Sequence, residues 1–84
     1  MAANNYKGFN LFFDIADEEL RSFNQAVVLA NIVQDHSDET HTVSKGGLAL
    51  ILGYFNEIAP QFRNKVRGKF EVQMLQRGYV KHAS

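Results

Sequence analysis

The stretch that decides the fold is PQFRNKVRGKFEVQMLQRGY, residues 60–79. Two periodicities compete in it. Phe70, Val72 and Met74 alternate with polar residues, as in a half-buried strand, whereas a longer apolar series recurs at steps of four, as on one face of a helix. The series at steps of four is Phe62, Val66, Phe70 and Met74. The longer series favours a helix.

The ends of this stretch support the same interpretation. Pro60 suits the first position of a helix, because its fixed φ is helical and its missing N–H is not needed there. Gly78 suits the left-handed position that ends a helix, and Arg77 favours the negative end of the helix dipole. The alternative is an α+β fold, in which Gly68 ends a short helix and a C-terminal strand or hairpin runs through residues 69–75.

Two further helices are expected upstream. Asp14 or Asp17 can cap a helix over residues 15–35, and Ser44 can cap a second helix that Pro60 prevents from running on. A polar loop, residues 34–44, separates the two. We therefore predict a mainly α fold: one small three-helix domain spanning residues 1–84, with an aromatic N-terminal arm.

The expected core follows from helical spacing. Apolar residues at steps of three and four define one inward face on each helix, and the segment after Gln25 is apolar nearly all round, which indicates burial on two sides. The residues predicted to be buried are Leu20, Phe23, Val27, Leu48, Ile51, Leu52, Phe55, Phe62, Val66 and Phe70.

The composition is that of a small folded protein. The chain has 84 residues, is 45% hydrophobic, and contains seven Phe and three Tyr but no Cys. Because so short a chain buries a small core and has no disulfide, it depends on efficient packing or on self-association. Much of the aromatic content lies in the arm, YKGFNLFF at residues 6–13, which we expect to pack on the core.

Several function classes find no support in the sequence. The N-terminus has no targeting signal, and the longest apolar stretch, Leu48 to Phe55, is far shorter than a membrane span. His36 and His41 lie five residues apart in the polar loop, without the spacing of a metal site. No catalytic motif is present. We expect a cytoplasmic protein that is not an enzyme, has no cofactor or metal and does not enter membranes.

Charge is distributed unevenly along this neutral chain. Residues 1–42 hold two cations and seven carboxylates, whereas residues 43–84 hold seven cations and two carboxylates. On a helical wheel the cations of residues 63–77 surround the apolar row and do not form one basic stripe. A nucleic-acid-binding helix usually gathers its cations on one face of a basic domain. Pairing with acidic groups of the first helix, or of a partner protein, is the better interpretation.

A second apolar series on the same helix suggests a partner. Val72, Leu75 and Tyr79 lie on the far side from the first row, and one helix of a small domain seldom buries two faces alone. The arm of residues 6–13 is one candidate cover; a second subunit or a target protein is the other. The predicted partner-binding residues are Arg63, Arg67, Lys69, Val72, Leu75, Arg77 and Tyr79.

These observations lead to two hypotheses about function. The first is a small regulatory or adaptor protein that acts by protein–protein binding and is a homodimer or larger. We expect an inhibitor of a host machine, of the type that phages and mobile elements encode. The alternative is a small nucleic-acid-binding regulator that uses the basic C-terminal half.

Overall fold

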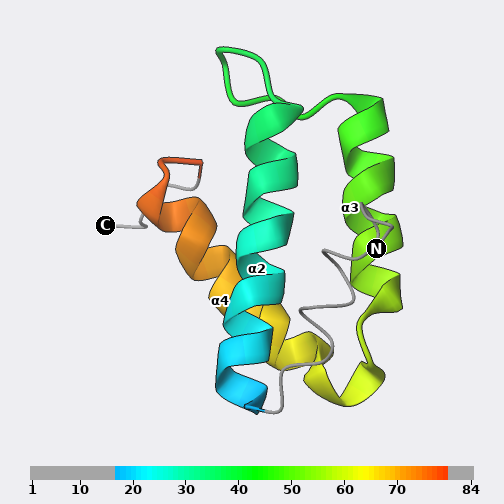
Figure 1. Ribbon diagram of the computed structural model, residues 1–84. Helices are drawn as coiled ribbons and strands as arrows, with labels where there is room; N and C mark the ends of the chain where they lie inside the picture. Colours follow the sequence, from blue (N-terminus) through cyan, green and yellow to red (C-terminus); the bar gives the residue numbers. More distant parts are fainter. Residues whose placement is uncertain (1–16, 80–84) are drawn as a thin grey trace, which may run out of the picture.

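The computed structural model describes residues 17–79, which form three helices (Figure 1). They are α2 (Glu18–Asp35), α3 (Lys45–Glu57) and α4 (Pro60–Gln76). No strand occurs in this part of the chain, where an isolated bridge between Ser37 and Val43 is the sole β pairing. The mainly α prediction is confirmed. The aromatic arm lies outside the described residues.

Two of the helices begin at the caps that the sequence predicts. The Asp17 carboxylate accepts hydrogen bonds from the backbone N–H groups of Glu19, at 2.9 Å, and Leu20, at 3.1 Å. The Ser44 hydroxyl accepts from the Gly47 N–H at 3.0 Å. Each side chain satisfies donors that have no partner within the first turn of the helix.

Residues 69–75 are helical, so the α+β alternative is wrong. Pro60 occupies the start of α4, and the helix continues through Gly68 to Gln76. Gly78 has a φ of 84°, the left-handed conformation expected just beyond a helix end. The Gly78 N–H donates to the carbonyl of Leu75, and the Tyr79 N–H to that of Met74. The i+4 series of apolar residues was thus the correct guide.

Helix α2 is the central element of the fold. Both α3 and α4 pack along it, whereas α3 and α4 contact each other much less (Figure 1). In the view of Figure 1, α3 stands beside α2 and α4 crosses behind it at an angle. The two-sided burial predicted for the second half of this helix follows from that arrangement, because Val28 and Ile32 pack on one cluster and Val33 belongs to another.

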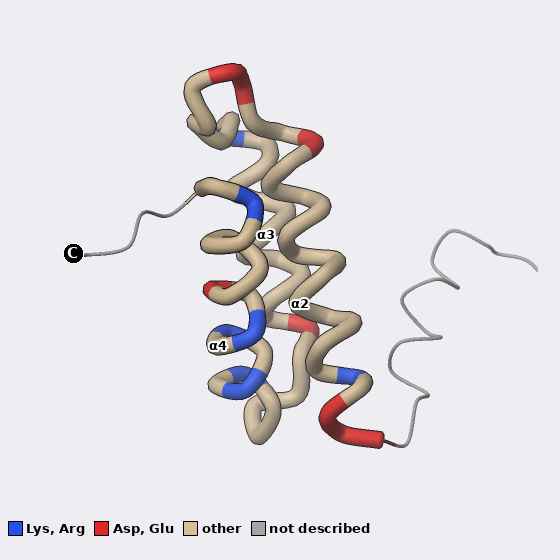
Figure 2. The backbone as a smooth tube through the Cα atoms, turned by 90° about the vertical axis from the view of Figure 1, so that its left-hand side faces the viewer, with Lys and Arg blue, Asp and Glu red and all other residues tan. Residues whose placement is uncertain are grey.

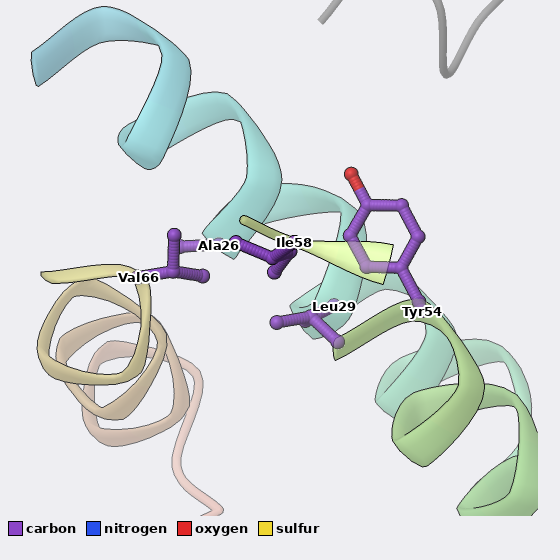
Figure 3. Packing of buried hydrophobic residues seen from close by; sticks show 5 residues of the cluster. All are labelled: Ala26, Leu29, Tyr54, Ile58 and Val66. Carbon is purple, nitrogen blue, oxygen red and sulfur yellow. The ribbon is translucent and has the colours of Figure 1, made fainter. Parts of the chain in front are cut away.

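The core consists of two adjoining apolar clusters. The larger joins Ala26 and Leu29 of α2 to Tyr54 of α3, Ile58 of the following turn and Val66 of α4 (Figure 3). The smaller contains Ala30, Val33 and Met74. Leu29 and Val66 are fully buried, so the contact between α2 and α4 excludes water at its centre.

The buried face differs from the predicted one. Of the ten residues expected in the core, Val66 alone is buried. Five are half-buried: Val27, Ile51, Phe55, Phe62 and Phe70. The other four are exposed: Leu20 at 49%, Phe23 at 44%, Leu48 at 50% and Leu52 at 63%. On α2 the buried arc is rotated by roughly a third of a turn from the stripe of large apolar residues.

Small and polar residues explain that rotation. Ser22, Ala26 and Ala30 on α2 have little bulk, so the backbones of neighbouring helices approach closely on this side. Ser22 is accommodated because its hydroxyl donates to the Glu19 carbonyl at 3.0 Å. Gln25 is also buried, and its side-chain oxygen has no hydrogen-bond partner among the described residues. A pattern based on large apolar residues does not detect such a face.

The loop between α2 and α3 is held by its own hydrogen bonds. The Asp38 carboxylate accepts from the N–H groups of Thr40, at 2.8 Å, and Thr42, at 3.0 Å. At the base of the loop, a Cβ placed on Gly47 would lie 2.5 Å from the Cβ of His36. The absence of a side chain at Gly47 therefore leaves room for the side chain of His36.

Replacing one buried and one exposed leucine tests this core. We expect Leu29→Ala to lower the free energy of unfolding by about 2–5 kcal/mol, because it leaves a cavity where all three helices meet. Leu52→Ala removes the same atoms from a side chain that is 63% exposed and should change stability by less than about 0.5 kcal/mol. Urea unfolding of both variants measures the difference, and equal losses would contradict the observed face of α3.

Candidate protein-binding surface

Two lysines of α4 are bound to the start of α2. Figure 2 shows the basic positions along the backbone of α4 and the acidic positions where α2 begins. The Lys65 ammonium lies 2.6 Å from a carboxylate oxygen of Glu19 and 3.1 Å from one of Glu18. The Lys69 ammonium lies 2.8 Å from the other oxygen of Glu19. The acidic and basic halves of the chain therefore face each other in the fold, as the charge distribution suggested.

The electrostatics of this cluster centre on Glu19. Hydrogen bonds from Lys65 and Lys69 hold the pKa of Glu19 at about 2, well below its ordinary value of 4.5. In return, the hydrogen bond to Glu19 raises the pKa of Lys65. Because all three side chains are open to water, the cluster orients α4 on α2 at modest energetic gain.

Two arginines of the C-terminal half also contact their own fold. Arg63 donates from Nε to the Ile58 carbonyl at 3.0 Å and from Nη2 to the Asn56 carbonyl at 2.9 Å, which closes the turn between α3 and α4. Arg77 donates to the side-chain oxygens of Asn31, at 3.0 Å, and Gln34, at 2.9 Å, on α2. Neither guanidinium meets a carboxylate among the described residues.

Arg67 differs from the other cations of α4. Its guanidinium carbon lies 5.5 Å from the centre of the Phe55 ring on α3, and its side chain is exposed. No described carboxylate pairs with it, although Glu71 lies one helical turn further on. A cation that rests on an aromatic face keeps most of its hydrogen-bond donors available to a ligand.

The described surface displays six large apolar side chains that are 44% to 63% exposed. They are Leu20, Phe23, Leu48, Leu50, Leu52 and Val72. We define two faces among them. The α3 stripe comprises Leu48 and Leu52 with the half-buried Phe55; the α4 outer face comprises Gly68, Val72 and the half-buried Leu75. Each set lies on one side of its helix, since its members are three or four residues apart.

Two mid-helix glycines have no role in packing within the described fold. A Cβ added to Gly68 of α4, or to Gly53 of α3, would meet nothing within 4 Å. Glycine in a helix interior is unfavourable by up to about 1 kcal/mol relative to alanine. Gly68 therefore leaves open space beside Val72, where another backbone could approach closely.

The structure separates the seven predicted partner-binding residues into three groups. Val72 and Leu75 lie on the α4 outer face. Arg63 and Arg67 lie on the side of α4 that contacts the end of α3. Lys69, Arg77 and Tyr79 make contacts within the fold. The Tyr79 ring lies 4.3 Å from that of His41 and packs against the smaller cluster.

Sequence reasoning missed the most exposed part of this surface. Leu48 and Leu52 were assigned to the core, because α3 is apolar at many positions and an exposed leucine looks the same as a buried one in sequence. In the structure only Gly47 and Tyr54 of α3 are buried, which the sequence does not indicate. The open position of Gly68 has no sign in the sequence either.

Within residues 17–79, no three His, Cys, Asp or Glu side chains gather closely enough to hold a metal ion. None of α2, α3 and α4 is long and apolar enough to cross a membrane.

No protein-family model, curated protein or solved structure matches this chain.

The Glu19 cluster makes stability depend on acid pH. Because the pKa of Glu19 is lowered from 4.5 to about 2, its contribution is complete above pH 4.5 and is lost as the pH falls toward 2. We expect Glu19→Gln to destabilise the protein at pH 6 and to have little effect near pH 2. Urea midpoints across this pH range measure the effect.

Glu57→Gln is the matched control, since it makes the same charge change at an exposed residue outside the cluster. Asp38, whose pKa is lowered chiefly by the hydrogen bond from Thr40, is present in both variants, so its acid titration cancels from the comparison. A Glu19→Gln effect that is the same at pH 6 and pH 2 would show that the ion pairs do not stabilise the fold.

Proposed function

We propose that this protein is a small non-enzymatic regulator or adaptor that acts by binding another protein. The observation that supports the proposal is the contrast between its charged and apolar groups. Lys65, Lys69 and Arg77 are held by other parts of the fold, whereas leucine and valine side chains on α3 and α4 are half or more exposed. Exposed large apolar side chains beside an arginine that has no carboxylate partner among the described residues, here Arg67, are typical of protein interfaces.

The protein class that best fits this proposal is an accessory inhibitor. Small chains without a catalytic site can block a larger machine by occupying one of its surfaces, and phages and mobile elements encode proteins of this kind. Such a protein would act in the cytoplasm beside its target. This assignment rests on size and surface chemistry.

Affinity capture with face-specific variants tests protein binding. Leu52→Asp places a carboxylate on the α3 stripe, and Val72→Asp places one on the α4 outer face. Asn31→Asp is the control, because it adds the same charge at an exposed polar position of α2 and keeps the oxygen that accepts from Arg77. We expect a captured protein that the parent and the control retain and that at least one face variant loses. Identical capture by all four chains would contradict the proposal.

We propose in addition that the α4 outer face contacts a second copy of the chain. In a two-fold dimer the same patch meets itself, so two α4 helices would cross near Gly68, where the absence of a side chain allows close approach. Val72, at 50% exposure, and Leu75 would then cover each other across the crossing.

Two glycine variants separate self-association from folding. We expect the parent chain to sediment above its monomer mass of 9.5 kDa at micromolar concentration. Gly68→Gln should sediment as a monomer, because its side chain fills the crossing, whereas Gly53→Gln should not. Both should melt at or above the parent temperature at low concentration, since glutamine is the better helix former by about 0.5 kcal/mol. A parent chain that is monomeric at hundreds of micromolar would refute self-association.

A direct binding measurement tests the alternative of a nucleic-acid-binding regulator. Phosphate binding through several contacts weakens steeply with salt. Because Lys65 and Lys69 are already paired with Glu18 and Glu19, we expect no anisotropy change with duplex or single-stranded DNA or RNA at low salt. Tight binding that collapses on adding salt, and disappears in Arg63→Glu/Arg67→Glu, would replace the protein-binding proposal.

A further inference from the structure

The α3 stripe contains the most exposed large apolar side chain of the described residues. Leu52, at 63% exposure, lies at its centre, with Leu48 one turn before it and Phe55 one turn after. Positions separated by four and then three residues lie in a row along one side of a helix. The row therefore offers a narrow apolar track, which is the shape that the apolar side of another helix fits.

A cation stands at each end of this track. Arg67 lies over Phe55 at one end, at 5.5 Å from the ring centre. Lys45, in the first turn of α3, is exposed and lies on the same side of the helix as Leu48 and Leu52. Ten residues separate Lys45 from Phe55, so the backbone positions of these two residues are about 15 Å apart along the helix axis.

Neither cation has a carboxylate partner in residues 17–79. The ion pairs between described residues join Glu18 and Glu19 to Lys65 and Lys69, on the side of α4 that faces α2. Glu57 falls on the opposite side of α3 from Leu52, by its helical position. Glu71 is one turn from Arg67 but forms no ion pair with it. The track is therefore apolar along its length and positive at both ends.

From this pattern we infer that the α3 stripe binds an amphipathic helix of a partner protein that carries a carboxylate at each end of its apolar side. Residues 11 apart in a helix lie on the same side, about 16 Å apart along the axis, which is close to the rise between Lys45 and Phe55, the residue that Arg67 covers. Because both ends of the track are cationic, the partner helix can lie in either direction. The inference rests on the proposed function and names the chemistry of the partner.

Charge complementarity distinguishes this occupant from a second copy of the chain. Two α3 stripes meeting each other would bring Lys45 and Arg67 of one copy against the same cations of the other or against leucine, with no described carboxylate in the contact. Like charges across an interface oppose binding, whereas opposite charges favour it. The α4 outer face lies on a different helix, and none of its three residues is a cation.

Three synthetic peptides provide the test with the full-length chain. Each is an amphipathic helix with leucines spaced to match the α3 stripe. The acidic peptide carries glutamates 11 residues apart at the ends of its apolar side, the neutral peptide has glutamines there, and the basic peptide has lysines. Fluorescence anisotropy gives each Kd, and amide chemical shifts of the labelled chain locate the contact.

We expect the acidic peptide to bind most tightly and the basic peptide least. The shifts should concentrate at Leu48, Leu52, Phe55 and Arg67, and the preference should shrink as salt is raised. Arg67→Gln should weaken binding of the acidic peptide by roughly fivefold, as expected for one charge pair at the rim of an interface. Gln76→Glu makes the same change in net charge at the far end of α4 and should leave the preference intact.

Each outcome bears on a separate claim. Equal affinities for the three peptides at the α3 stripe would contradict the claim that the partner helix is acidic at both ends. They would leave protein binding supported. Shifts confined to another face, or no binding by any peptide, would overturn the inference for this stripe. Failure of protein binding altogether would appear in the capture experiment instead, as identical capture by the parent, Leu52→Asp and Val72→Asp.

Discussion

The rest of the structure depends on the buried contact that α2 makes with its two neighbours. Leu29 is fully enclosed where α2, α3 and α4 meet, and Ala26 and Ala30 bring the helix backbones close on either side of it. Since α3 and α4 contact each other little, this one face holds the domain together. A domain of this size has a small total stability, so its few buried side chains matter individually.

The small residues of α2 also determine which side chains remain outside. Because α2 turns its Ser22–Ala26–Ala30 side inward, the large residues Leu20 and Phe23 are carried to the surface. On α3 the inward positions are Gly47 and Tyr54, and the leucines between them are exposed. Close packing on one side of a helix and an apolar surface on another are therefore two results of the same arrangement. The exposed apolar residues are therefore a consequence of how the helices pack.

Local chemistry made much of the fold predictable from sequence. Asp17, Ser44, Pro60 and Gly78 act through their own side chains or backbone angles, so their roles as helix boundaries can be recognised without knowing the tertiary structure. The pairing of opposite charges was also predictable, because the distribution of charge is visible in the sequence. Seven of nine carboxylates precede residue 43, and seven of nine cations follow it.

The rotation of each helix about its axis was not predictable in the same way. Burial of Ser22 and Gln25 depends on residues of α3 and α4 that are distant in sequence, and a polar residue at such a position is the opposite of what a hydrophobic pattern indicates. Some residues of the candidate surface are among those that the sequence analysis names. Arg67, Val72 and Leu75 lie on accessible sides of α4, but Leu48 and Leu52 were missed because composition does not distinguish surface leucine from core leucine.

Arg63 holds the turn between α3 and α4 with two hydrogen bonds, and these preorganise the surface beside the turn. Its guanidinium satisfies the carbonyls of Asn56 and Ile58, which a helix end leaves without N–H partners, and so fixes the direction in which α4 leaves α3. Phe55 and Arg67 are thereby set side by side before any ligand arrives. A helix that binds along α3 would meet a surface already in its final shape, so little conformational entropy of the receptor would be lost on association.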